Sequence, residues 1–358
     1  MKTIKIILAI ILLVFIVSCK SKTSYYKMVS IFDRKGNVHR ELYAFGDSAF
    51  MAGNISNNPF LFELDSDWHI HRFDTIIRYN FFGNEEKLNV KIIKDATSIE
   101  NYAKDIRCDE KNRSLTVPEE SLIKKSGWFY TNYSFQAVYK KFQYNLPVPI
   151  DDYLNKEEQI LWTQGNMDDY KIMNGMEMND YLSEIAEKFW KWHGCNRFEI
   201  SLEIIKKQVQ NYDLDSDKEK IYKQAIAFVD KESIAIDPKT LSEVLDSFYK
   251  TNYFSKQYNT YKEIWDEDFQ TTFAIEEILM NVISYELVLP DKTVQTNAPI
   301  ISSDTLTWKI DGMRLLFDDY TLTAEYRVMN RWAFGISGLL VLVAVGSGVL
   351  VVRRKNRR

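Results

Sequence analysis

The spacing of hydrophobic and polar residues changes along the chain, and each change predicts a different kind of structure. After two lysines near the start, residues 6–17 are apolar without a break. Alternating, aromatic-rich runs then predict strands in much of 19–150, beginning with a hairpin at 25–45 whose turn contains Gly36. Further strands are expected at 60–64, 68–82, 87–94 and 128–142, with a short helix at 97–107.

Apolar residues recur every three or four positions in residues 151–283, which predicts helices. We expect one helix to end at Gly194 and another to begin with Asp237 as its cap and Pro238 in its first turn. A longer helix is expected at 255–282. Strand patterns return in 284–331, including 285–290, 304–310, 312–317 and 320–330.

The last long apolar stretch predicts a transmembrane helix. Residues 332–352, from Trp332 to Val352, carry no charge and number 21, which is enough to cross a bilayer. Trp332 suits the membrane interface, and the basic tail that begins with Arg353 and Arg354 favours the cytoplasm. We therefore expect a protein of the cell membrane with residues 20–331 outside the cytoplasm.

The first apolar stretch is too short to span a bilayer and is typical of a signal peptide. Its end, Ile16-Val17-Ser18-Cys19, resembles the lipobox of bacterial lipoproteins. That resemblance implies removal of residues 1–18 and attachment of a lipid to Cys19. The alternatives are a plain signal peptide and an uncleaved anchor.

Together these patterns predict an α+β protein. Because a lipid at Cys19 and the transmembrane helix would hold both ends at one membrane, we expect the first and last strands to be antiparallel neighbours in one sheet. A helical block would interrupt that sheet, although the block could instead be a separate domain. The expected parts are a signal peptide (1–18), a β-rich part (19–150), a helical insertion (151–283), closing strands (284–331), a transmembrane helix (332–352) and a cytoplasmic tail (353–358).

The closing strands contain a second resemblance. Leu289-Pro290, then Thr296-Asn297-Ala298, then Trp308 are similar in order to a segment of LppM-type bacterial lipoproteins, although Asp291 replaces that family's glycine. The resemblance implies a β-rich envelope domain and points to lipid as a ligand. It transfers no catalytic residue, since Pro290 would make a bend, Asn297 a turn and Trp308 part of the core.

Charge narrows the range of partners. The net charge of the whole chain is -4, but the tail contributes +5 and residues 1–19 contribute +2, so the body between them carries -11. An acidic body argues against nucleic acid as a partner. Aromatic residues make up 14% of the chain, which indicates a well-filled core or, alternatively, an aromatic-lined binding surface.

Candidate chemistry is sparse. His69 and His71 would share one face of a strand and could bind a metal with Asp67, but three polar residues on a solvent-facing strand are the simpler interpretation. Cys108 and Cys195 could form a disulfide outside the cytoplasm. No catalytic or nucleotide-binding motif is present, and we expect no cofactor.

Three functions remain open. The leading hypothesis is a doubly anchored envelope lipoprotein that binds lipid, a peptide or a membrane partner without catalysis. The second is an accessory or assembly subunit of a membrane complex, which predicts an exposed apolar patch on the helical block. The third is an envelope hydrolase, which predicts a pocket with converging Asp, Glu or His side chains.

Overall fold

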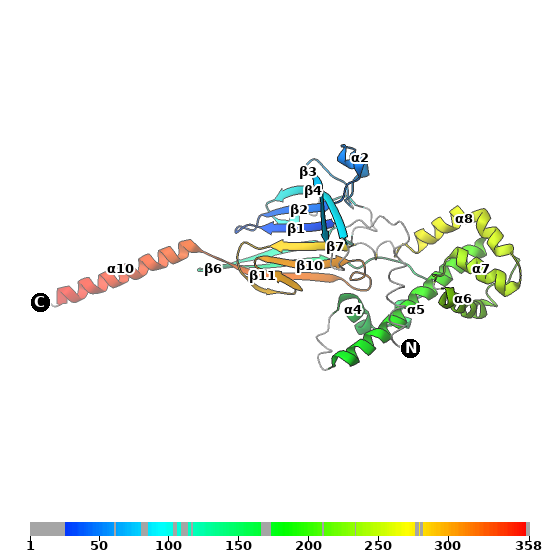
Figure 1. Cartoon of the computed structure of the whole chain (residues 1–358). Coiled ribbons are helices and arrows are strands. Elements are labelled where there is room, and N and C mark those ends of the chain that lie inside the picture. Colours follow the sequence, from blue (N-terminus) through cyan, green and yellow to red (C-terminus); the bar gives the residue numbers. More distant parts are fainter. Residues whose placement is uncertain are drawn as a thin grey trace. The chain divides into compact units, whose positions relative to one another are not determined.

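The computed structural model describes residues 26–60, 62–79, 85–102, 106–108, 114–115, 117–165, 173–209, 211–232, 234–275, 279 and 282–355. Within them the chain forms two compact units, shown in Figure 1. The sheet unit comprises Ser24–Lys141 and Asn281–Arg358, and the helical unit contains Phe142–Met280. The expected α+β class, with strands from both ends of the chain and a helical block between them, is confirmed.

The larger sheet of the sheet unit has seven strands in the order β3-β4-β2-β1-β7-β10-β9. All its neighbouring strands are antiparallel except β1 and β7. Its strands are β1 (Tyr26–Phe32), β2 (Val38–Ala44), β3 (His69–Tyr79), β4 (Glu85–Ala96), β7 (Val282–Val288), β9 (Ile300–Ser302) and β10 (Thr305–Asp311).

The smaller sheet has four antiparallel strands in the order β5-β6-β11-β8. The central pair, β6 and β11, runs side by side in register from Tyr130 opposite Met329 to Tyr139 opposite Tyr320. Its strands are β5 (Glu119–Ser126), β6 (Tyr130–Tyr139), β8 (Thr293–Thr296) and β11 (Tyr320–Met329).

The expected pairing of the first and last strands is wrong. The first strand, β1, lies beside β7 in parallel, and the last strand, β11, belongs to the smaller sheet. A parallel pair needs a long connection, which the many residues between β1 and β7 provide. The antiparallel contact between the two halves of the chain is made by β6 and β11 instead.

The two sheets pack through their inner faces. Phe32 of β1 contacts Phe135 and Tyr326 of the smaller sheet at ring centroid distances of 5.7 and 6.4 Å. Tyr285 of β7 meets Phe135 from the same side, and its ring lies 6.0 Å from that of Trp308 on β10. Trp308 is fully buried, so the aromatic-rich sequence does fill a core here.

The helical unit is built from η4 (Ile150–Asp152), α4 (Lys156–Gln164), α5 (Gly175–Gln208), α6 (Lys218–Glu232), α7 (Pro238–Tyr249) and α8 (Tyr253–Thr272). Asp237 caps α7 and Pro238 follows it, as expected. The expected end of a helix at Gly194 is wrong, because α5 continues and buries Phe198 and Leu202 beyond that residue. The expected helix at 255–282 is shorter and has a kink at Tyr261.

Other local predictions also need correction. The described residues of 60–64 form no strand, and 97–107 contains only the short helix η3 (Ile99–Asn101) in its described part. Residues 312–317 form turns rather than a strand. Strand β5 was not expected, because its charged sequence has low β propensity. The short helices α2 (Ser48–Met51) and η2 (Ile55–Asn57) lie between β2 and β3.

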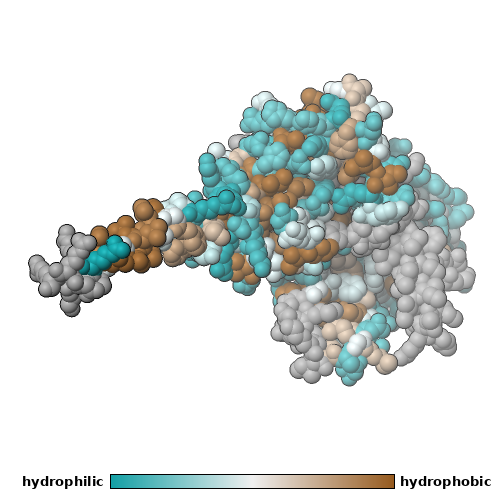
Figure 2. All heavy atoms as spheres, turned by 60° about the vertical axis from the view of Figure 1, so that its left-hand side comes forward, coloured by the Kyte–Doolittle hydropathy of each residue, from teal (hydrophilic) through white to brown (hydrophobic). Residues whose placement is uncertain are grey.

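The sheet unit ends in α10 (Arg331–Lys355), which begins one residue after β11. In the described part of the chain, it is the one helix whose length and composition suit a membrane span, over Arg331–Leu350. Only 6% of its most apolar window is buried within the protein. Figure 2 shows hydrophobic side chains gathered along α10, and the other described residues leave most of this apolar surface exposed.

Candidate functional site

The aromatic end is the cluster formed by the turn between β5 and β6 and the first residues of α10. Trp128 lies against Trp332 with ring centroids 5.2 Å apart. Phe129 lies 4.8 Å from Phe334, and Tyr130 meets the same ring at 6.2 Å. Two segments about 200 residues apart in the sequence therefore form one aromatic surface where the apolar helix begins.

Asn330 joins these two segments. Its backbone N–H donates to the Phe129 carbonyl at 2.8 Å. Its side-chain amide donates to the carbonyls of Gly127 (2.9 Å) and Trp128 (3.2 Å), and its Oδ1 accepts from Thr131 Oγ1 at 3.1 Å. Because Asn330 lies between β11 and α10, these bonds fix the turn to the start of the helix.

The turn itself requires a glycine. A Cβ atom on Gly127 would lie 2.8 Å from the Tyr130 carbonyl oxygen, closer than real Cβ contacts. The N–H of Gly127 donates to that same carbonyl at 2.9 Å and closes the turn. This tight geometry leaves the two following aromatic residues at the tip of the hairpin.

The rings of the aromatic end remain half exposed despite their mutual contacts. Trp128 is 51% exposed, Phe129 41% and Trp332 56%, while neighbouring Met329 is 43% exposed. Folding thus leaves a contiguous apolar surface, joined to the exposed apolar surface of α10. Such a surface is the usual mark of an interaction with another apolar partner or with a membrane.

Basic side chains surround this surface. Lys124 and Lys125 precede the turn on β5, Arg327 lies near the end of β11, and Arg331 begins α10; all are exposed. The Arg327 guanidinium lies 5.7 Å from the Tyr130 ring centroid. Neither 124–131 nor 326–334 contains an acidic residue. The acidic body of the protein therefore has a basic, aromatic end.

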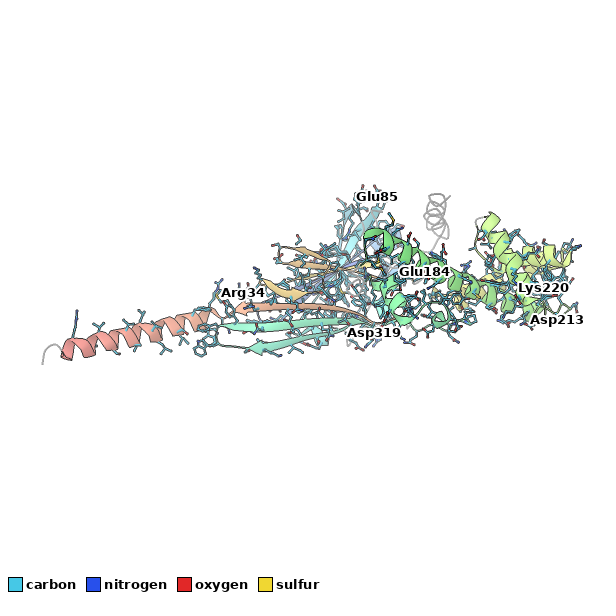
Figure 3. The ribbon with its side chains drawn as sticks, turned by 90° about the horizontal axis from the view of Figure 1, so that it is seen from below. Arg34, Glu85, Glu184, Asp213, Lys220 and Asp319 are labelled. Carbon is cyan, nitrogen blue, oxygen red and sulfur yellow. The ribbon has the colours of Figure 1, made fainter. Side chains whose placement is uncertain are left out.

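The opposite end of the β6–β11 pair is charged. Lys140 Nζ lies 3.2 Å from both Asp319 and Glu119, and Asp319 also accepts the Lys141 N–H at 3.0 Å. Figure 3 labels Asp319 at the end of the strands far from α10. Burial raises the pKa of Asp319, but the hydrogen bonds from Lys141 and Lys140 outweigh it, so the pKa is lowered.

A buried polar centre links the inner faces of the two sheets. Arg40 of β2 donates two hydrogen bonds to Glu120 of β5, at 2.8 and 2.6 Å, and both side chains are almost fully buried. Tyr285 donates to Glu120 at 2.8 Å, and Arg40 Nε donates to Ser30 at 3.0 Å. The Tyr102 ring covers the guanidinium at 4.1 Å.

The protonation of this centre argues for a structural role. Burial disfavours the charged guanidinium, but the charge of Glu120 outweighs it, so the pKa of Arg40 is raised. Burial and the charge of Glu120 raise the pKa of Tyr285 well above its usual value. Both groups keep their protons near neutral pH, so neither is poised to act as a general acid or base there.

A shallow hollow of about 430 Å³ lies at one end of β1, β2 and β4. At its rim, His39 Nδ1 lies 2.7 Å from Asp95 Oδ1. It could take a short apolar segment with a polar end, but it is open and encloses no reactive group. Its lining residues are Ile31, Phe32, Asp33, Asn37, Val38, His39, Asp95, Ala96 and Thr97.

The residues proposed from the sequence as membrane anchors lie on α10 where they are described. Trp332 is exposed at the start of α10, Arg353 is exposed near its end, and Val352 and Arg354 belong to the same helix. Cys19 lies outside the described residues, so its lipid attachment stays a prediction.

The candidate metal residues form no metal site among the residues that the structure describes. His69 and His71 are exposed on β3, and Asp67 lies 3.6 Å from Lys94 Nζ. Among the residues that the structure describes, no group of three His, Cys, Asp or Glu side chains could hold a metal ion.

The two cysteines belong to different units. Cys108 lies in the sheet unit, whereas Cys195 lies on α5 of the helical unit and hydrogen-bonds with Tyr153. The placement of one unit relative to the other is not determined. A disulfide between them therefore stays a prediction.

Sequence reasoning missed two features that carried a signal. Phe129 falls in the strand expected at 128–142, but the run Gly127-Trp128-Phe129-Tyr130 near two lysines is also typical of a membrane interface. Arg40 shares the buried alternation of β2 with Val38 and Leu42, so a charge on the core face was visible. Neither partner could be identified without the pairing of the strands.

Comparison with known proteins gives little support for assigning this chain to a family. No family model and no curated protein matches the chain. The NMR structure of the folded domain of Mycobacterium tuberculosis LppM aligns with 86% of this chain and 90% of that chain, at 8% identity and a TM-score of 0.25. The resemblance to LppM-type lipoproteins is thus a weak structural likeness, and a lipobox is not shown by it.

Proposed function

We propose that this chain is a membrane-anchored ectodomain that binds a lipid, peptide or membrane partner without catalysis. The observation that carries the proposal is α10, an exposed apolar helix that continues from β11 with one residue between them. An exposed apolar helix of this length is costly in water and is satisfied in a bilayer.

In this proposal a second anchor, a lipid on Cys19, holds the other end of the chain. The support is the sequence Ile16-Val17-Ser18-Cys19 at the end of a short apolar run. The basic residues that follow the span, Arg353 and Arg354 among them, favour a cytoplasmic tail and therefore residues 20–331 outside the cytoplasm.

A binding role accounts for the described side chains better than catalysis does. Among the described residues, the ion pair of Arg40 with Glu120 is almost fully buried and held by two hydrogen bonds. The hollow beside His39 includes the apolar residues Ile31, Phe32 and Val38 in its lining. An assembly role through the helical unit has less support, because the exposed large apolar residues described there come from separate segments: Met173, Met176, Ile234 and Ile264.

Intact mass and membrane fractionation test the anchors, with the wild type beside Cys19→Ala. We expect the wild type to lose residues 1–18 and to gain the mass of acyl chains. The Cys19→Ala protein should lack that mass and still remain in the membrane through α10. An unmodified wild type would contradict the lipid anchor, and release of Cys19→Ala by an alkaline wash would contradict the transmembrane anchor.

Native mass spectrometry of the full chain, released from nanodiscs made with native lipids, tests the binding role. Ile31 lines the hollow and is 36% exposed, so Ile31→Asp would place a charge in its lining. We expect a retained non-covalent ligand mass that Ile31→Asp removes. Ile77→Asp is the matched control, since Ile77 is 58% exposed on β3 of the same sheet, outside the hollow. A wild type that retains no ligand, or equal retention in both variants, would contradict binding in the hollow.

A further inference from the structure

We infer that the turn between β5 and β6 is a second membrane-contacting element, in which Trp128 and Phe129 lie among the lipid headgroups beside α10. This inference rests on the proposed membrane span of α10 and adds a function for the aromatic end. As a consequence, the two sheets cannot reorient freely about α10. The tip of the β5–β6 hairpin also contacts the bilayer and fixes the angle between the sheets and the membrane.

The depth of the tip follows from one hydrogen bond. Trp128 Nε1 donates to Ser337 Oγ at 3.0 Å. Ser337 comes six residues after Arg331, which is about 9 Å along the axis at about 1.5 Å per residue. If Arg331 lies in the outer headgroups, Trp128 lies near the boundary with the hydrocarbon, where tryptophan is enriched in membrane proteins.

The turn cannot stay in water while α10 spans the bilayer. Asn330 bonds to Gly127, Trp128 and Phe129, and two ring pairs join the turn to the helix. These contacts are made by Asn330, directly before α10, and by Trp332 and Phe334 in the first turn of α10. A bilayer that surrounds this part of α10 therefore also surrounds the half-exposed rings of the turn.

The chemistry of the flanks suits lipid headgroups with negative charge. Lys125 lies on β5, which leads into the turn, and Arg327 lies near the end of β11, which leads into α10. Arg331 is the first residue of α10. Long basic side chains can keep their charge among phosphates while their stems cover apolar surface. Anionic lipids attract such basic clusters near the membrane surface.

The opposite end of β6 and β11 is charged, in contrast to the aromatic end. Lys140, Asp319 and Glu119 form ion pairs there, on exposed side chains. Ten residue pairs of β6 and β11 separate this charged end from the aromatic end. With the aromatic end in the interface, the two strands lead away from the bilayer and the charged end lies in water.

Fluorine NMR of the full chain labelled with 5-fluorotryptophan, in nanodiscs of phosphatidylcholine and phosphatidylglycerol, tests the inference. Each of the eight tryptophans can be assigned by a Trp→Phe variant. Spin-labelled lipid broadens signals near the bilayer, and a soluble gadolinium chelate broadens signals in water. We expect Trp128 and Trp332 to respond to the lipid probe, whereas Trp308, which is fully buried, responds weakly to either.

The outcomes separate this inference from the proposed function. If Trp332 responds to the lipid probe but Trp128 responds to the gadolinium chelate, the anchor stands and the inference is wrong. If neither tryptophan responds to the lipid probe, the membrane span of α10 has failed and the inference fails with it.

Charge reversal tests the preference for anionic lipid. Lys125→Glu with Arg327→Glu should weaken the response of Trp128 to the lipid probe and raise its response to the chelate. Lys140→Glu with Lys141→Glu changes the net charge equally at the far end of the strands and should leave Trp128 unaffected. Equal effects of the two double variants would overturn the assignment to anionic headgroups.

Discussion

Two regions of the sheet unit reverse the usual distribution of side chains. In the polar centre, the charges of Arg40 and Glu120 are buried, whereas in the aromatic end the rings of Trp128, Phe129 and Trp332 are exposed. Each charge in the centre meets its partner inside the protein. The aromatic end finds too little cover within the sheet unit, so its surroundings have to come from outside that unit. The first region is thus explained by the fold, and the second by the membrane contact that we propose.

The largest loss of stability is expected in the buried polar centre around Arg40 and Glu120. Arg40→Ala leaves the carboxylate of Glu120 buried without its cation, which should destabilise the sheet unit by about 3–5 kcal/mol. Hydrogen–deuterium exchange of β2 and β7 in the full chain measures this unit by itself. A destabilisation below about 1 kcal/mol, which is typical of a surface ion pair, would contradict the burial of Arg40 and Glu120.

A double variant separates the loss of the pair from the loss of one partner. In Arg40→Met with Glu120→Leu, no charge stays buried and Tyr285 can still bond to Ser30, which lies 3.2 Å away. Replacing a buried pair by apolar residues is often neutral or stabilising. We therefore expect this variant to recover most of the stability lost in Arg40→Ala.

An intermediate loss of stability is expected at Asn330, which joins the β5–β6 turn to α10. Asn330→Ala removes two donated hydrogen bonds and one accepted bond that hold the turn to α10. Leaving those groups without partners should cost about 1–3 kcal/mol locally. Faster amide exchange at Phe129 and Thr131, with β1 and β2 unchanged, is the expected result. Unchanged exchange in the turn would mean that the ring contacts alone hold it.

At the tip of the β5–β6 turn, we expect substitutions to change stability little and membrane contact strongly. Trp128→Ala with Phe129→Ala alters half-exposed rings, so the core of the sheets should change by only about 0.5 kcal/mol. Amides of the turn should nevertheless lose their protection in nanodiscs. Ile77→Ala with Tyr79→Ala removes even more exposed apolar groups from β3 and should change no protection by lipid. Equal behaviour of the two variants would remove the distinction between the aromatic end and ordinary surface.

The smallest effect is expected at the charged end and depends on pH. The folded-state pKa of Asp319 is lowered from 3.8, so its carboxylate stabilises the fold above that value and the stabilisation is lost as the pH falls below it. Amide exchange of β11, measured for the wild type and Asp319→Asn, should show this loss only in the wild type. The same acid dependence in both proteins would assign it to another group.

The parts of the fold that depend on local pattern were predictable. The span of α10 follows from 21 uncharged residues, and the start of α7 follows from Asp237-Pro238. The prediction that a helix ends at Gly194 is wrong because a buried helix face continues on both sides of it. Packing of that face outweighs the weak helix propensity of one glycine.

The candidate site was only half predictable, for a physical reason. Trp332 could be assigned to the interface from its position beside the apolar run. Trp128 could not be placed beside it, because that contact depends on the register of β6 with β11 and on the side chain of Asn330. Long-range strand pairing leaves little trace in the local sequence of either strand.

Protease protection in intact spheroplasts tests the central claim most directly, with a peptide tag added after Arg358. If α10 spans the membrane with the sheet unit outside, added protease should digest the body and leave a protected, tagged fragment that contains α10. Digestion of the tag together with the body, in cells whose cytoplasmic proteins remain intact, would contradict a membrane span and with it the membrane-facing role of the aromatic end.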